Sequence, residues 1–203
     1  MTASGSPLRA AVLASGGGSN LQAIIDHLDA LGSARAASVV LVASDRAGAG
    51  ALNKAHTHGI ETALIAAPAN GAALVALLDS HRIELVVLAG YLKFVPHEVT
   101  RRWAGRIINI HPALLPKYGG AGMYGRRVHE AVIAAGETES GATVHQVNEE
   151  FDRGEIIAAE RVRVEQGDTV ETLAARVLAA EHRLYPRTVQ QLAAKLLKKS
   201  HSA

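Results

Sequence analysis

The sequence predicts an α/β fold, doubly wound around a mostly parallel sheet, with an antiparallel extension toward its C-terminal end. Three observations predict this fold. Up to His111, short runs that are apolar at nearly every position recur along the chain. Segments with helical spacing of apolar residues separate these runs. After His111, the expected strands alternate between apolar and polar residues. Runs that are apolar at every position indicate strands covered on both faces, and their alternation with helices indicates a parallel, Rossmann-like sheet.

Length and composition favour one globular domain. The 203 residues are 48% hydrophobic and 20% charged, which is typical of soluble globular proteins. The chain has no internal repeat and no linker that would mark a second domain. We therefore expect a flexible N-terminus over residues 1–8, a single domain over residues 9–199 and a short tail over residues 200–203.

The charge balance and the missing residue types exclude several classes of protein. A net charge of +2 gives no reason to expect a nucleic-acid or membrane partner. The chain has no cysteine, which excludes disulfides, thiolate zinc sites and a cysteine nucleophile. No apolar run is long enough to span a bilayer, and residues 1–7 lack a signal-peptide core, so we expect a cytoplasmic protein.

A glycine-rich turn, Ser-Gly-Gly-Gly-Ser-Asn at residues 15–20, joins the first expected strand, residues 9–14, to an amphipathic helix. Glycines let the backbone approach a phosphate, and the start of a helix supplies free N–H groups. The turn is neither a Walker motif nor a complete G-x-G-x-x-G, because Leu21 stands where the last glycine would be. The loop alone therefore leaves open whether it binds an anion or is only a tight turn.

The other elements of the parallel part follow in order. Strands are expected at residues 38–43, 60–66, 85–89 and 107–110, and helices at residues 47–58 and 69–80. In the last of these helices, Leu74, Leu77 and Leu78 are spaced to face inward. Parallel strands end at one edge of the sheet, where open α/β sheets bind their ligands.

Asn109 and His111 interrupt the last parallel strand, which otherwise consists of isoleucine. Residues i and i+2 of an extended chain point to the same side, and Pro112 biases His111 toward extended geometry. An amide can donate to a developing oxyanion, and an imidazole can move a proton near neutral pH. We therefore expect these side chains to project together from the strand's end. For either residue alone, a polar side chain satisfied by the backbone is the alternative.

The pattern changes after His111. We expect a loop with four glycines at residues 117–125 and a helix within residues 123–135. Two strands are expected at residues 142–148 and 156–164, and a long amphipathic helix at residues 169–198. The two strands carry polar residues among the apolar ones, which is typical of a half-exposed antiparallel pair. Pro186 is expected to break or kink the long helix, because proline lacks the N–H that the helix interior needs.

Four segments and one acid together resemble a known family. The segments are residues 15–24 (SGGGSNLQAI), 86–91 (VVLAGY), 109–118 (NIHPALLPKY) and 181–186 (EHRLYP), and the acid is Asp152. From about residue 9 to about residue 192 the chain resembles the formyltetrahydrofolate-dependent formyltransferases. The Asn-x-His-Pro core with the later Asp is specific to this superfamily, and the glycine loop points to its glycinamide branch.

The resemblance implies a role for each candidate residue. Asn109 would hydrogen-bond the formyl oxygen, His111 would be the proton-carrying partner, and Asp152 would hold the imidazolium and raise its pKa. The substrate-binding residues would be Gly17, Gly18, Ser19, Asn20 and Glu181, and the residues of the folate slot would be Leu92, Lys93, Phe94, Val95 and Asn109. The implied reaction moves the formyl group of the co-substrate 10-formyltetrahydrofolate to the amine of glycinamide ribonucleotide, with no metal.

The chain departs from the family's most familiar pattern in three places. Residues 119–125 lengthen the loop after Pro116, Arg153 stands where glycine is common, and residues 66–73 lack an arginine that some relatives use for folate. These departures bear on the contacts of the folate tail and on the dynamics of the loop.

The ten histidines do not form a metal motif, because no pair has ligand spacing with a supporting acid. His145 could line the site, although a structural role is favoured, and His129 is expected on the helix after the site.

Three other functions remain as alternatives. A formyltetrahydrofolate deformylase uses the same Asn, His and Asp but normally has an extra N-terminal domain, and a methionyl-tRNA formyltransferase has an extra C-terminal domain. A non-catalytic nucleotide-binding module would explain the glycine loop but not the three polar residues together. We expect small-molecule partners and a monomer or homodimer.

Overall fold

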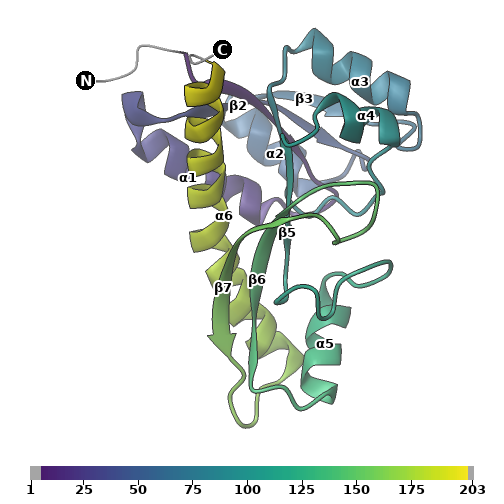
Figure 1. Ribbon diagram of the computed structural model, residues 1–203, viewed down its shortest axis with the longest axis vertical. Helices are drawn as coiled ribbons and strands as arrows, with labels where there is room; N and C mark the ends of the chain where they lie inside the picture. The colour runs from purple at the N-terminus through teal and green to yellow at the C-terminus, as the bar shows by residue number, and fades with distance from the viewer. Residues whose placement is uncertain (1–5, 201–203) are drawn as a thin grey trace.

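The computed structural model describes residues 6–200, so parts of the predicted flexible ends, residues 1–5 and 201–203, lie outside the described range. The described chain forms one seven-stranded sheet with the order β3-β2-β1-β4-β5-β6-β7 (Figure 1). The strands are β1 Leu8–Leu13, β2 Ala37–Ser44, β3 Glu61–Leu64, β4 Leu85–Leu88, β5 Ile107–His111, β6 Glu139–Gln146 and β7 Ile156–Arg163. The first five are parallel, and β6 and β7 are antiparallel, which confirms the predicted fold class.

The helices lie on both faces of this sheet, and Figure 1 shows α1 beside α6 and α3 beside α4. They are α1 Ser19–Ala30, η1 Gly32–Ala34, α2 Gly50–Thr57, α3 Gly71–Ser80, α4 His97–Arg102, α5 Arg126–Ala134 and α6 Val170–Ser200. Among the helices of residues 6–200, none has the length and apolar character that crossing a membrane requires.

The core has two halves, one on each face of the sheet. Along β1, Ala10 and Val12 pack in the half that contains α1 and α6, whereas Ala11 and Leu13 pack in the half that contains α3 and α4. Successive side chains of a strand point to opposite faces, so a strand that is apolar throughout supplies both halves. This is the physical reason that the non-alternating runs predicted the parallel sheet correctly.

The antiparallel extension differs from the expected half-exposed pair. In β6, residues 140–145 are all buried. The strand lies between β5 and β7, and on one face its Val144 packs in the core half that contains α6. On the other face, Thr143 Oγ1 accepts from the Leu115 N–H at 3.1 Å and donates to the Ala113 carbonyl at 2.7 Å. The prediction of half-exposure was therefore wrong for β6. It describes β7, where most side chains are exposed or half-buried.

The helix α6 continues through Pro186, so the expected break does not occur. Tyr185 is fully buried, and its hydroxyl lies 2.9 Å from the Leu88 carbonyl and 3.1 Å from the Ile108 carbonyl. Val189, one turn further on, is also buried in the core. This packing on both sides of Pro186 stabilises the helical path, although the proline leaves one carbonyl of the preceding turn without its N–H partner.

Candidate active site

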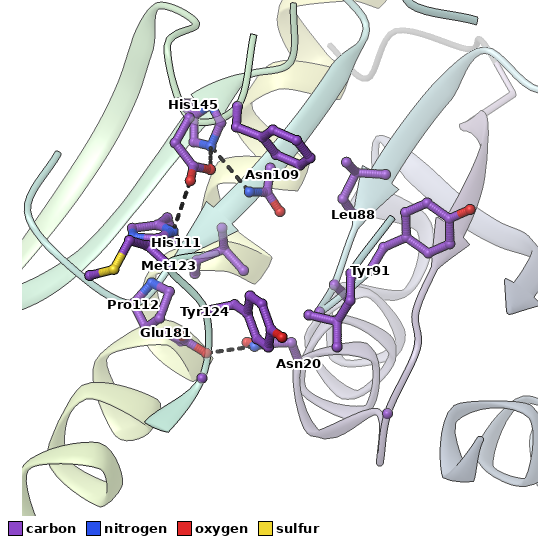
Figure 2. Close-up of a pocket in the computed structure, with 18 of the residues that line it drawn as sticks. Asn20, Leu88, Tyr91, Asn109, His111, Pro112, Met123, Tyr124, His145 and Glu181 are labelled. Atoms are coloured by element: carbon purple, nitrogen blue, oxygen red, sulfur yellow. Dashed lines mark hydrogen bonds and ion pairs between the residues drawn. The ribbon is translucent and has the colours of Figure 1, made fainter. Parts of the chain in front are cut away.

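One cavity of about 460 Å³ opens where β1, β4 and β5 end. Figure 2 shows side chains from β4, β5 and β6, from α1 and from α6 converging on it. It lies where the strand order passes from β1 to β4, the position at which doubly wound sheets bind their ligands. The cavity lining includes every residue to which the resemblance gives a role in the site, namely Gly17, Gly18, Ser19, Asn20, Leu92, Lys93, Phe94, Val95, Asn109, His111, Asp152 and Glu181.

The glycine loop forms one end of the cavity, and α1 begins at Ser19 directly after it. Asn20 Nδ2 donates to Glu181 Oε2 at 2.6 Å, which joins the start of α1 to α6. Glu181 is only 7% exposed, and burial raises its pKa to about 7, although the Asn20 hydrogen bond acts in the opposite direction. This end of the cavity therefore combines the free N–H groups of a helix start with a carboxyl that titrates near neutral pH.

Gly17 and Gly18 serve different purposes. Gly18 has φ +73°, and a Cβ on it would lie 2.7 Å from Ala51 Cα, so the missing side chain allows α2 to pack against the loop. A Cβ on Gly17 would meet no other part of the chain within 4 Å. Since Gly17 lines the cavity, its missing side chain leaves room for a ligand.

The segment after β4 forms an apolar wall of the cavity. Val95 is buried, whereas Leu92 is 39% exposed and Phe94 is 37% exposed. The Phe94 ring meets the Phe151 ring edge to face, with 5.1 Å between the ring centroids. Exposed apolar side chains that flank a cavity are suited to a flat ring system.

Ser15 ties this wall to the glycine loop. Its hydroxyl accepts from the Leu92 N–H at 2.9 Å and donates to Asp45 Oδ1 at 2.6 Å. The two ends of the cavity are therefore fixed relative to each other by one buried hydroxyl group.

Asn109 and His111 lie between the two ends, on the same side of β5 as the sequence predicted. Ile108 and Ile110 point the other way, into the core half of α6. His111 Nε2 donates to the Tyr118 carbonyl at 2.7 Å, because a carbonyl can only accept. His111 Nδ1 lies 3.5 Å from Asp152 Oδ2, which also accepts from the Gly120 N–H at 2.9 Å.

Burial and charge act in opposite directions on this pair. Burial lowers the pKa of His111, and the Asp152 charge and the Tyr118 carbonyl raise it, with a net shift downward. The sequence suggested that Asp152 would raise the pKa; it does so, but burial has the larger effect. For Asp152, burial raises the pKa. The Gly120 N–H and the rings of His145 and His111, when these rings carry a proton toward the carboxylate, lower it further than burial raises it. The carboxylate is therefore held ionised beside two imidazoles.

We expect Asp152→Asn to lower the pKa of His111 further. The substitution removes the negative charge that raises this pKa and leaves the burial that lowers it. NMR titration of the His111 ring measures the shift directly, and any limb of a pH–rate profile that follows His111 should move to lower pH. Glu149→Gln removes an exposed charge three residues away and is the matched control. An unchanged or higher His111 pKa in Asp152→Asn would contradict this electrostatic pairing.

From the sequence, His145 could line the site but a structural role was favoured; the structure places it in this cluster. It faces Asn109 directly across β5 and β6, its Nε2 lies 3.1 Å from Asn109 Nδ2, and the same Nε2 lies 3.4 Å from Asp152 Oδ1. Paired residues on adjacent strands point to the same side of a sheet, so the strand register would have revealed this contact. The lining also includes His129, which lies on α5 as expected, and parts of the loop at residues 120–125; neither was placed in the cavity from the sequence. Within residues 6–200, no three potential ligands gather as a metal site would require.

Residues 8–189 match the formyl transferase family. The chain belongs to this family. It is 42% identical over 186 residues to the chloroplastic phosphoribosylglycinamide formyltransferase of Arabidopsis thaliana, an alignment that covers 88% of this chain and 63% of that protein. It is 41% identical over 191 residues to the trifunctional purine biosynthetic protein adenosine-3 of Bos taurus, covering 91% of this chain and 18% of that protein.

The fold is likewise that of a formyl transferase. The crystal structure of glycinamide ribonucleotide transformylase 1 from Symbiobacterium toebii superposes with a TM-score of 0.85 at 37% identity, covering 93% of this chain and 89% of that one. This chain spans less than two thirds of the length of the Arabidopsis protein and under a fifth of the bovine protein.

Proposed function

We propose that this formyl transferase moves the formyl group of 10-formyltetrahydrofolate to the amine of N1-(5-phospho-D-ribosyl)glycinamide, giving formylglycinamide ribonucleotide in de novo purine (IMP) biosynthesis. One observation carries the proposal. A single cavity has a helix start at one end, an apolar wall at the other and the Asn109, His111 and Asp152 cluster between them. The names of the Arabidopsis and Symbiobacterium relatives support formyl transfer to the glycinamide ribonucleotide.

The ribonucleotide would bind at the glycine-loop end. Its phosphate would accept from N–H groups at residues 17–20, where the start of α1 favours an anion. Glu181, on the neighbouring face of α6, would accept from the ribose hydroxyls or the amine. Binding energy from the distant phosphate would then position the amine for attack.

The folate would bind along residues 92–95. Its flat pterin ring suits the apolar surface formed by Leu92, Phe94 and Val95, and the backbone groups of this segment can hydrogen-bond the ring edge. The formyl group would then lie beside Asn109, within reach of both ends of the cavity.

The three polar residues would divide the chemistry. The amine attacks the formyl carbon and forms a C–N bond, while the formyl oxygen becomes an oxyanion that accepts from the Asn109 amide. His111 carries a proton beside the oxyanion, and Asp152 stabilises the imidazolium. The bond to the folate nitrogen then breaks, and the proton lost by the attacking amine is transferred to that nitrogen. No covalent enzyme intermediate and no metal is part of this route.

The main alternative is a deformylase, in which water takes the place of the amine. We expect formyl groups to appear on the glycinamide nitrogen when both substrates are present, and folate release without the acceptor to fall to a small fraction of that rate. A phosphate site and a buried Glu181 have no use in a simple hydrolase. Quantifying free formate and formylated ribonucleotide in parallel decides between them. Rapid release of formate without the acceptor would overturn the proposal in favour of the hydrolase.

The remaining expectations belong to the same proposal. The partners are the two small molecules, with no role for nucleic acid or membrane, and the protein acts as a monomer or homodimer in the cytoplasm. The near-neutral charge supports the choice of partners.

A further inference from the structure

The orientation of the Asn109 amide matters for the proposed reaction but is not set by packing. The nitrogen and oxygen ends of an amide have nearly the same size, and only their hydrogen-bond partners distinguish them. The reaction needs an N–H of this amide at the oxyanion. A neighbouring group must therefore determine which end faces which way.

His145 is the neighbour that can do so. It is 2% exposed, and its Nδ1 lies 2.7 Å from the Gln146 carbonyl. A carbonyl only accepts, so Nδ1 carries the hydrogen, and a neutral ring then has a bare Nε2. This Nε2 lies 3.1 Å from the Asn109 amide and can only accept, which requires the amide to present its nitrogen.

Asp152 competes for the same atom. Its Oδ1 lies 3.4 Å from His145 Nε2, and its Oδ2 lies 3.5 Å from His111 Nδ1. If His145 Nε2 carried a proton, it would donate to Asp152. The Asn109 amide would then face an N–H donor and would have to turn its oxygen toward the ring. A proton on His111 Nδ1 would give Asp152 a donor without this change, and it would make His111 an imidazolium, because its Nε2 already donates to the Tyr118 carbonyl. When His111 is neutral, Asp152 still accepts from the Gly120 N–H.

We propose that His145 is a positioning residue for Asn109, with its bare Nε2 holding the amide nitrogen on the β6 side. One N–H of Asn109 is then used by His145, and the other remains for the oxyanion. The amide oxygen lies on the side away from His145, as Figure 2 shows, where it can accept from the attacking amine. This role in catalysis rests on the proposed function, whereas the protonation pattern does not.

The first test is the tautomer of His145 in the free protein. Long-range ¹⁵N–¹H NMR correlations of ring-labelled histidine distinguish a protonated nitrogen from a bare one, and the missing signals of His145→Gln assign the ring. We expect a proton on Nδ1 of His145, a bare Nε2, and a proton on Nε2 of His111. A proton on Nε2 of His145 at the pH of the activity assay would overturn the proposal.

The second test measures formyl transfer. His145→Leu removes the acceptor and is expected to lower kcat about tenfold, an effect within the range of one hydrogen bond, while both KM values change little. His145→Gln should recover most of the loss, because its Oε1 can accept in the position of Nε2. His56→Leu, an exposed histidine on α2, is the matched control. Equal losses in the Leu and Gln variants would contradict a role as acceptor.

A double variant separates positioning from general packing. If His145 acts through Asn109, adding His145→Leu to Asn109→Ala should cause no further loss of kcat. A further tenfold loss would overturn the proposal. The absence of formyl transfer by the unaltered chain would instead overturn the proposed function, and the NMR result would still decide whether His145 holds Asn109.

Discussion

Asn109→Ala is expected to lower kcat for formyl transfer by about 10²–10³-fold, because it removes the amide that would donate to the oxyanion. The loss should appear in kcat more than in KM, since the hydrogen bond strengthens as charge develops on the formyl oxygen. Steady-state assays with both substrates measure the two constants separately.

His111→Ala should also lower kcat sharply, because it removes the group proposed to carry the proton.

The folded structure should survive Asn109→Ala, because this half-buried side chain forms its hydrogen bond with His145 at the cavity rather than within the core. Thermal unfolding followed by circular dichroism checks this point. Asn53→Ala, on the exposed side of α2, makes the same chemical change away from the cavity and should leave kcat unaltered. Near-normal turnover by a folded Asn109→Ala variant would remove Asn109 from the mechanism.

Gly18→Ala is expected to destabilise the protein, whereas Gly17→Ala is expected to impair substrate binding. A Cβ on Gly18 would lie 2.7 Å from Ala51 Cα, so α2 would have to move. Overpacking of this kind typically costs about 1–3 kcal/mol, and the positive φ adds roughly 1–2 kcal/mol. A methyl group on Gly17 meets open space in the cavity, where the phosphate is proposed to lie.

Urea unfolding and substrate titrations separate these two effects. Gly18→Ala should lower the free energy of unfolding, and Gly17→Ala should leave it nearly unchanged while raising KM for the ribonucleotide far more than KM for the folate. Gly59 has φ +67°, and a Cβ on it would meet no other part of the chain within 4 Å, so Gly59→Ala measures the strain of positive φ alone. If Gly17→Ala raised both KM values equally, the phosphate would not bind there.

Much of the candidate site was predictable because its signals are local. The glycine turn before α1, the apolar β5 interrupted at Asn109 and His111, and the proline after His111 each occupy a few consecutive residues. Parallel strands bring their carboxyl ends to one edge, so the cavity's position followed from the strand–helix alternation. The resemblance to the formyltransferases added Asp152 and Glu181, which no local pattern connects to the others.

What the sequence by itself determined is the fold class, the edge of the sheet that carries the cavity and the residue types that line it, because these depend on hydrophobic periodicity and on glycine and proline. Only the tertiary structure decided the contacts between distant segments. The β5–β6 register placed His145 opposite Asn109, the approach of α2 assigned Gly18 to packing, and burial outweighed the Asp152 charge in setting the pKa of His111. These outcomes depend on strand register and on the balance between burial and charge, neither of which is contained in a local stretch of sequence.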